Sequence, residues 1–364
     1  MVTPRSPGID SEVKGTKIIR IDPSRPEIES IRKAANIIRK GGTVAFPTET
    51  VYGLGADALN PEAVMKIFKA KERPPDNPII VHISSGDWIR RLGREVPRNF
   101  WKLNDRFWPG PLTMVLRASD IVPRVTTGGL DTVAIRMPSH RVASALIQES
   151  AVPIAAPSAN LAGRPSPTTA EHVINDLAGR IDLILDAGPT NVGVESTVVD
   201  LTTDPPMMLR PGGTTYEELR DVLGGLSLHP SVQARTEPHI ERALSPGMKY
   251  RHYAPKAEVI LIEGNPDAMV GKIREMAKEY SSDGKKVGIL AFEESIYEYS
   301  NATVKSMGSM VDLKTAAKRV FSLLRELDEE GVDVILAEGM PERGLGLAVM
   351  NRLRKASGYR IMEI

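Results

Sequence analysis

Hydrophobic periodicity is lost between residues 224 and 256, and the pattern differs on the two sides of that stretch. Before it, many short apolar runs such as Thr43–Phe46 predict strands, with fewer amphipathic helices among them. After it, strand and helix patterns alternate regularly. The sequence therefore predicts an α+β domain with a curved sheet over 28–223, a linker over 224–256 and a smaller parallel α/β domain over 257–364.

Composition narrows the classes of protein to which the chain can belong. The 364 residues carry a net charge of +1, so any strongly positive site must be local. The absence of cysteine excludes disulfides, thiolate zinc sites, iron–sulfur clusters and cysteine nucleophiles, and it fits a reducing cytosol. No signal-peptide pattern is present, and no apolar run approaches the ~20 residues of a membrane helix. We therefore expect a cytoplasmic protein that does not contact a membrane.

Two loops that follow predicted strands are rich in small and hydroxyl-bearing residues. The first, Pro47–Leu54, contains Thr50. The second, Ala155–Gly163, contains Ser158, and Ser166 lies just beyond it. Loops at strand ends often bind ligands, and small residues let backbone N–H groups approach a ligand closely. Ordinary turns explain the same residues equally well for the first loop, because Ser, Thr and Gly favour turns.

Basic residues gather at the end of a predicted helix, Pro61–Ala70. Lys71 and Arg73 complement the helix dipole there, which is a sufficient structural explanation. The prolines of the following loop would also hold Arg73 and Asn77 in fixed places, and rigid cations suit a polyphosphate. His82, flanked by apolar residues in the next strand, is more often a core residue than a ligand.

Further polar groups lie within or at the ends of predicted strands. Arg136 lies in the apolar strand Thr132–Met137, and a buried arginine needs an anionic partner. That partner is either a structural carboxylate or the carboxylate of a substrate. Ser196 and Arg210 each lie beside another predicted strand, and each is a weak signal by itself.

The predicted linker contains one segment of unusual composition, Ser245–Lys256. It carries Tyr250, Tyr253, His252 and three cations between prolines. Such a segment could cover an anionic, nucleotide-like ligand. The alternative is a linker that merely packs on a domain surface.

Seven motifs in a fixed order identify a family. They are PTETVYGLG, a KxR followed by NP and a strand histidine, AIRMP, APSAN, ESTVVD, LRPG and SPGMKYRHYAP. In this order they resemble the threonylcarbamoyl-AMP synthase family, the YrdC-like proteins, in its long two-domain form. The resemblance implies a twisted, curved sheet with flanking helices and a concave, locally positive cavity, followed by a Rossmann-like domain.

The resemblance also assigns residues to ligands. Residues matched to the threonine site are Thr50, His82, Thr132, Arg136, Ser158 and Ser196. Residues matched to the ATP site are Lys71, Arg73, Asn77, Ala156, Ser166, Arg210, Tyr250 and Tyr253. Lys71 and Arg73 are the expected catalytic residues, Mg²⁺ is expected on the ATP phosphates, and no protein metal ligands are expected.

The implied reaction joins L-threonine, bicarbonate and ATP into threonylcarbamoyl-AMP and releases pyrophosphate. A separate transferase system then passes the threonylcarbamoyl group to tRNA, whose direct contact with this chain the sequence leaves open. Such chemistry depends on positioning and charge neutralisation more than on a protein nucleophile. We further expect the linker to cover the cavity, with Tyr250 or Tyr253 protecting the adenylate from water.

Three other functions are alternatives to this one. A non-catalytic RNA-binding module would usually show stacked aromatics and a basic balance, whereas aromatic residues make up 5% of this chain. A related hydrogenase-maturation enzyme carries cysteine-rich zinc modules, which this chain cannot have. A regulatory sensor of threonine or nucleotide is the third alternative.

Overall fold

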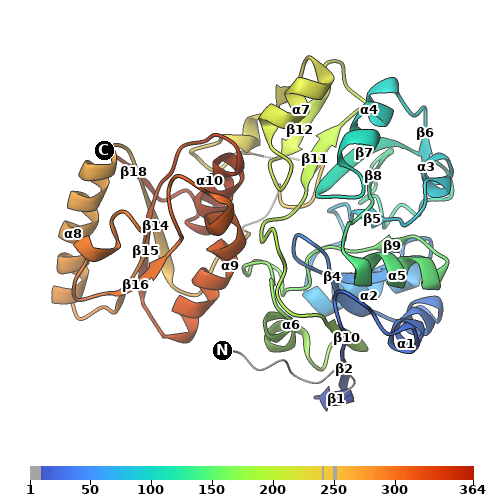
Figure 1. Ribbon diagram of the computed structural model, residues 1–364, viewed down its shortest axis with the longest axis horizontal. Helices are drawn as coiled ribbons and strands as arrows, with labels where there is room; N and C mark the ends of the chain where they lie inside the picture. The colour runs from blue at the N-terminus through green and yellow to red at the C-terminus, as the bar shows by residue number, and fades with distance from the viewer. Residues whose placement is uncertain (1–9, 240–241, 249–251) are drawn as a thin grey trace.

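The N-terminal part of the molecule is built on one large mixed sheet (Figure 1). The computed structural model describes residues 10–239, 242–248 and 252–364. The strands pair in the order β1-β2-β10-β3-β4-β9-β5-β8-β7-β11-β12-β13, and β6 pairs with β7 beside this path. In chain order they are β1 (Asp10–Val13), β2 (Thr16–Arg20), β3 (Val44–Pro47), β4 (Tyr52–Asp57), β5 (Val81–His82), β6 (Gly93–Arg94), β7 (Leu112–Ala118), β8 (Thr132–Arg136), β9 (Ile154–Ala155), β10 (Leu183–Asp186), β11 (Thr197–Asp200), β12 (Met207–Arg210) and β13 (Ser227–Leu228).

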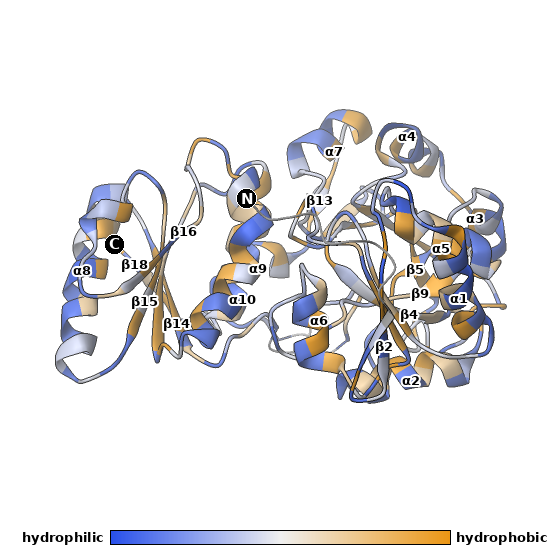
Figure 2. Cartoon of the chain, turned by 60° about the horizontal axis from the view of Figure 1, so that its bottom comes forward, coloured by the Kyte–Doolittle hydropathy of each residue, from blue (hydrophilic) through white to orange (hydrophobic). Residues whose placement is uncertain are grey.

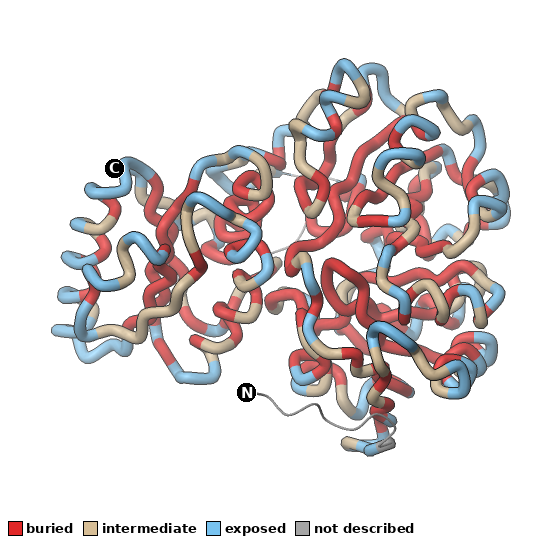
Figure 3. The backbone as a smooth tube through the Cα atoms, in the orientation of Figure 1, coloured by how far each residue is buried: buried red, intermediate tan, exposed pale blue. Residues whose placement is uncertain are grey.

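Helices cover both faces of this sheet, and most residues of the strands between them are buried (Figure 3). They are α1 (Ile28–Arg39), α2 (Pro61–Lys71), α3 (Asp87–Leu92), α4 (Arg98–Phe107), α5 (Arg141–Ser150), α6 (Ala170–Leu177) and α7 (Tyr216–Leu223). One core cluster contains α1 and α5, and a second contains the other five helices. Helix α2 shows why the sequence forms these elements: the Asn60 side chain caps its first turn, and Val64, Ile67 and Phe68 form one buried face.

The C-terminal part is a parallel sheet of five strands in the order β16-β15-β17-β14-β18. Its elements are β14 (Glu258–Glu263), α8 (Pro266–Ser282), β15 (Val287–Ala291), β16 (Thr303–Ser306), α9 (Lys314–Glu329), β17 (Val334–Glu338), α10 (Leu345–Ala356) and β18 (Ile361–Glu363). A short 3₁₀ turn, Ile296–Glu298, lies between β15 and β16, and another, Pro230–Val232, lies in the stretch predicted as linker. Helix α8 covers one face, and α9 and α10 lie between the other face and the N-terminal part (Figure 1). Strands β14 and β15 are hydrophobic on both faces, as expected for a covered parallel sheet (Figure 2).

Several elements differ from the sequence-based expectation. The motif loop that begins at Pro47 is short, because the chain turns back at Tyr52 into β4, which pairs antiparallel with β3. Helices α3 and α4 were not predicted. Strand β13 pairs with β12 inside the stretch predicted as linker, so a cut after Leu223 would remove part of the large sheet. No helix in the described ranges is long and apolar enough to cross a membrane.

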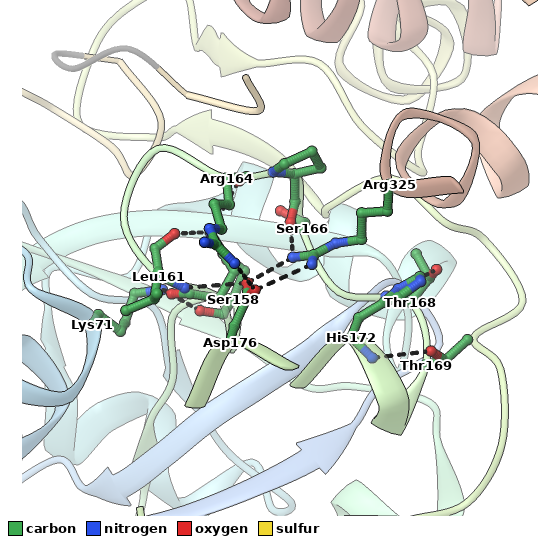
Figure 4. A network of polar contacts seen from close by, with 12 residues as sticks. Lys71, Ser158, Leu161, Arg164, Ser166, Thr168, Thr169, His172, Asp176 and Arg325 are labelled. Atoms are coloured by element: carbon green, nitrogen blue, oxygen red, sulfur yellow. Dashed lines mark hydrogen bonds and ion pairs between the residues drawn. The ribbon is translucent and has the colours of Figure 1, made fainter. Parts of the chain in front are cut away.

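The two parts meet through buried ion pairs. Asp176 on α6 has a fully buried side chain, and Arg325 of α9 donates to it at 2.7 Å. Arg164, in the loop before α6, binds the same carboxylate at 2.8 Å (Figure 4). Burial opposes ionisation of Asp176, but the two guanidinium groups outweigh it and lower the pKa of the carboxyl.

The backbones of the two parts also approach closely at Gly193, which suggests a first prediction. A Cβ built on Gly193 would lie 2.3 Å from the Cα of Lys318, and Gly193 has φ +83°. We expect Gly193→Ala to lower the free energy of unfolding by more than the ~1–3 kcal/mol of left-handed strain alone. Urea denaturation measures this free energy of unfolding. Gly188→Ala is the matched control, because Gly188 has φ +78° and no atom within 4 Å of an added Cβ. Equal losses in both variants would contradict a tight interface at Gly193.

Candidate active site

A cavity of about 360 Å³ opens on the large sheet where several strands end. Its walls come from the loops after β3, α2 and β9, from the loop before β11, from the strand residues His82, Arg136 and Arg210, and from the linker. Predicted site residues that line it are Thr50, Lys71, Arg73, His82, Arg136, Ala156, Ser158, Ser166, Ser196, Arg210 and Tyr253. Segments far apart in the sequence therefore meet in one concave site, which is the arrangement of a ligand-binding pocket.

Three predicted residues are not placed in this cavity. Thr132 begins β8, four residues before Arg136, and a rise of ~3.3 Å per residue carries it away from the cavity end of the strand. Asn77 is fully buried beside the cavity wall, and its carbonyl accepts from Arg73 at 3.3 Å. Tyr250 lies outside the described residues. The assignment of Thr132 to threonine therefore has no support from its position.

Arg136 is the central cation of the cavity end nearest Thr50. Its side chain is almost wholly buried, donates to Thr50 Oγ1 at 3.0 Å, and lies 2.7 Å from a carboxylate oxygen of Glu49. Neither charged atom of this ion pair is aligned for a hydrogen bond. Arg136 therefore has a structural partner within the same motif loop, and it also faces the cavity.

His82 lies beside Arg136 with its ring edge on to Phe46, at 6.3 Å between ring centroids. Burial and the positive charge of Arg136 lower the pKa of His82 to about 3. The imidazole is therefore neutral at physiological pH, and its Nδ1 has no hydrogen-bond partner in the protein. A neutral ring that lines the cavity can both pack and bind, and the assignment of His82 to threonine stays a prediction.

Lys71 also lines the cavity, as a buried residue at the end of a helix. It ends α2, is 3% exposed, and donates from Nζ to the carbonyls of Ser158 and Asn160 at 2.5 and 2.6 Å. Burial, and then the charge of Arg73, hold the pKa of Lys71 well below its usual value. Arg73 is less buried, with its guanidinium over the Phe68 ring.

Glu195 connects the cavity to the C-terminal part. Its carboxylate accepts from Ser166 Oγ at 2.6 Å and from Arg352 Nε of α10 at 2.8 Å. Burial raises its pKa, but Arg352 and Arg210 outweigh that effect and hold the pKa at about 2. Glu195 is thus a buried anion that holds Ser166 in place. The sequence showed Glu195 as part of the motif ESTVVD, but gave no sign of this role.

The linker closes one side of the cavity. Pro246, Gly247, His252 and Tyr253 line it, and Arg210 donates to the Pro246 carbonyl at 3.2 Å. Tyr253 stacks on Phe321 of α9 at 5.1 Å, so the C-terminal part holds this ring in place. Burial lowers the pKa of His252 to about 3 and raises that of Tyr253 to about 12, so both are neutral.

Comparison with known proteins places this chain in a family. It is 54% identical over 340 residues to the threonylcarbamoyl-AMP synthase of Pyrococcus abyssi, covering 93% of this chain and 97% of the relative. The chain belongs to the threonylcarbamoyl-AMP synthase family. The Bacillus subtilis synthase is 49% identical over 335 residues, 92% of this chain and 94% of the relative. Family models described as telomere recombination and as threonylcarbamoyl-AMP synthase, C-terminal domain, match residues 36–212 and 214–358.

Solved structures confirm both the family and the fold class predicted from the motifs. The crystal structure of Pyrococcus abyssi Sua5 complexed with L-threonine superposes with a TM-score of 0.90 at 53% identity, covering 95% of this chain and 99% of that chain. A double variant of the same synthase gives a TM-score of 0.91 at 52% identity, over 96% and 98% of the two chains. The roles of individual residues in this synthase family member remain predictions.

Proposed function

We infer that this chain synthesises threonylcarbamoyl-AMP for the threonylcarbamoyladenosine modification of tRNA. One observation carries the inference: residues assigned by motif to threonine and to ATP converge on a single cavity in a chain of this family. Thr50 accepts a hydrogen bond from Arg136, Ser196 accepts one from Arg210, and all four residues line the cavity. L-Threonine, bicarbonate and ATP are the proposed substrates.

The geometry suits a reaction of positioning and charge neutralisation. The threonine amine must first take up bicarbonate as a carbamate, with loss of water. A carbamate oxygen then attacks the α-phosphorus of ATP, and the bond to pyrophosphate breaks. Lys71, Arg73 and Arg210 provide cations for the phosphates. A bound triphosphate would favour the charged form of Lys71, because an opposite charge raises the pKa of an amine.

Mg²⁺ would enter with ATP. Within the ranges that the structure describes, no three acidic or histidine side chains gather as a metal site. Glu195, which lines the cavity, is engaged by Arg352, and Glu49, outside the lining, is engaged by Arg136. A Mg²⁺ ion bound mainly by phosphates and waters needs no such cluster, so these residues fit an ion that ATP itself carries. Its chemistry would be neutralisation of phosphate charge.

Pyrophosphate release tests the proposed activity directly. The purified chain should release pyrophosphate only when ATP, bicarbonate and L-threonine are all present, and labelled bicarbonate should appear in an acid-labile adenylate. Omission of any one substrate should abolish both signals. Equal pyrophosphate release without threonine would overturn the assignment and indicate a plain pyrophosphohydrolase.

Threonine recognition gives a second prediction. Arg136→Lys keeps the charge but loses the planar fork that grips a carboxylate at two points. We expect the variant to bind ATP as the parent does and to bind L-threonine with a dissociation constant raised by ~10-fold or more, as for the loss of one charged hydrogen bond. Calorimetric titration with each substrate measures both. If the variant instead unfolds at ordinary temperature, the pair with Glu49 is purely structural.

We also propose that the linker acts as a lid that keeps water from the adenylate, a mixed anhydride that hydrolyses easily. Support comes from Tyr253, which lines the cavity and is fixed by Phe321. A third prediction follows: Tyr253→Ala should raise the ATP consumed per intact product, while Tyr253→Phe should raise it less because the ring remains. Product and pyrophosphate are measured in the same reaction. An unchanged ratio in Tyr253→Ala would leave the linker as a spacer.

A further inference from the structure

A second cavity, of about 440 Å³, lies in the C-terminal part, outside the site described above. It opens at the carboxyl ends of β14 and β17, which are neighbours in the parallel sheet. The helices that follow these two strands, α8 and α10, cover opposite faces of the sheet (Figure 1). In open α/β sheets this switch point is where ligands bind. Position alone therefore marks the cavity as a candidate ligand site.

The charges around this cavity do not balance within the C-terminal part. Arg354 is buried and donates to both Glu263 and Glu342, with two nitrogen–oxygen contacts of 2.6–3.0 Å to each. One guanidinium thus faces two carboxylates, and Glu363 at the end of β18 adds a third. Three carboxylates therefore share one buried arginine within the C-terminal part, and a second cation nearby would reduce their mutual repulsion.

That second cation comes from outside the C-terminal part. Arg235, a linker residue, has its guanidinium 3.6 Å from Glu263 and 3.7 Å from Glu342, and it forms a close pair with Glu363. Its side chain is 50% exposed, whereas that of Arg354 is 1% exposed. Half-exposed ion pairs contribute only ~0–1 kcal/mol each. The Arg235 side chain is therefore weakly held beside these carboxylates, and another cation could take its place.

The rest of the lining is apolar and adaptable. Met269, Met310, Met340 and Met350 face the cavity together with prolines. Thioether side chains adapt to alkyl groups of varied shape. We propose that this cavity binds a small organic cation, a guanidinium or ammonium group on an alkyl chain, and that Arg235 is the internal group that occupies the cationic position. Because Arg235 belongs to the linker, a bound cation releases the linker at that point.

Calorimetric titration of the full chain with agmatine, an alkylguanidine, tests the proposal. Arg235→Ala should bind one agmatine, and the parent chain should bind it about tenfold more weakly or worse because Arg235 competes. Arg274→Ala is the matched control, since Arg274 forms a single exposed pair with Glu298 in the same part of the molecule. It should behave like the parent chain.

Adding Glu342→Gln to Arg235→Ala should weaken agmatine binding by about tenfold or more, as for the loss of a charged hydrogen bond. If that double variant does not fold, Glu363→Gln replaces it, because Glu363 is 60% exposed. No heat of binding in Arg235→Ala would overturn the proposal. So would equal affinity in Arg235→Ala, Arg274→Ala and the parent chain, or an affinity insensitive to loss of the carboxylate.

Discussion

Replacing Arg352 by methionine should lower the free energy of unfolding by about 3–5 kcal/mol at pH 7, because it leaves Glu195 buried and charged without its partner. Arg352 is wholly buried, and besides Glu195 it donates to the carbonyl of Pro211 at 2.9 Å. Methionine has a similar shape but no charge. Urea denaturation of the intact chain, followed by fluorescence and circular dichroism, measures the loss.

The stability lost in Arg352→Met should depend on pH, because it arises from the charge on Glu195. In the parent chain the pKa of Glu195 falls from 4.5 to about 2 on folding, so its contribution is complete above 4.5 and is lost as the pH falls through about 2. Without Arg352 the folded carboxyl should keep a higher pKa. The difference in stability between variant and parent should therefore shrink as the solution is acidified below pH 4.5.

A double variant provides the control. Glu195→Gln combined with Arg352→Met removes both charges, and replacing a whole buried pair is often nearly neutral. It should recover most of the stability that Arg352→Met loses. If the double variant is as unstable as the single one, packing of the Arg352 side chain, and not its charge, holds the two parts together.

The second large effect is expected at Lys71. Lys71→Met should reduce turnover by about 10²–10³-fold, the usual result of removing one group that stabilises developing charge in a closed site. It should also lower stability by ~1–3 kcal/mol, because the carbonyls of Ser158 and Asn160 lose their donor. Steady-state pyrophosphate release and thermal unfolding measure the two effects separately.

Lys69→Met is the matched control for Lys71. Lys69 is the same residue type in the same last turn of α2, but its side chain is exposed. It should change neither turnover nor stability appreciably. A Lys71→Met chain that turns over as fast as Lys69→Met would show that Lys71 only holds the loop at Ser158 in place.

Local sequence was enough to predict much of the fold, and physical reasons explain what it missed. The regular alternation after residue 257 predicted the small parallel sheet, because each buried strand is apolar on both faces. Helix α4 was missed although Phe100 and Leu103 are buried at helical spacing, since the segment is crowded with charged residues and lies between prolines. Strand β4 was read as a loop because glycines at 53 and 55 suggest turns.

The candidate site, too, could be predicted in part from the sequence. The seven motifs predicted many of the residues that line the cavity, including Lys71 and Arg136, because each motif can be recognised from local sequence. The partners of Glu195 and Asp176 lie 157 and 149 residues away, on helices whose amphipathic pattern only indicates burial. No local pattern pairs such positions, so the contribution of α9 and α10 to the site could be learned only from the structure.

The two buried ion pairs between the two parts place the acid on one part and the arginine on the other, which affects how the two parts would behave if separated. In both pairs the N-terminal part supplies the acid, Glu195 or Asp176, and the C-terminal part supplies the arginine. Cut apart, the C-terminal fragment would expose the two arginines, and the N-terminal fragment would expose the two carboxylates, of which Asp176 keeps Arg164 as a partner. Opposite local charge steers association, faster at low ionic strength. Co-expressed halves divided in the linker should thus reassemble as a split enzyme, in an orientation that the placement of these charges dictates.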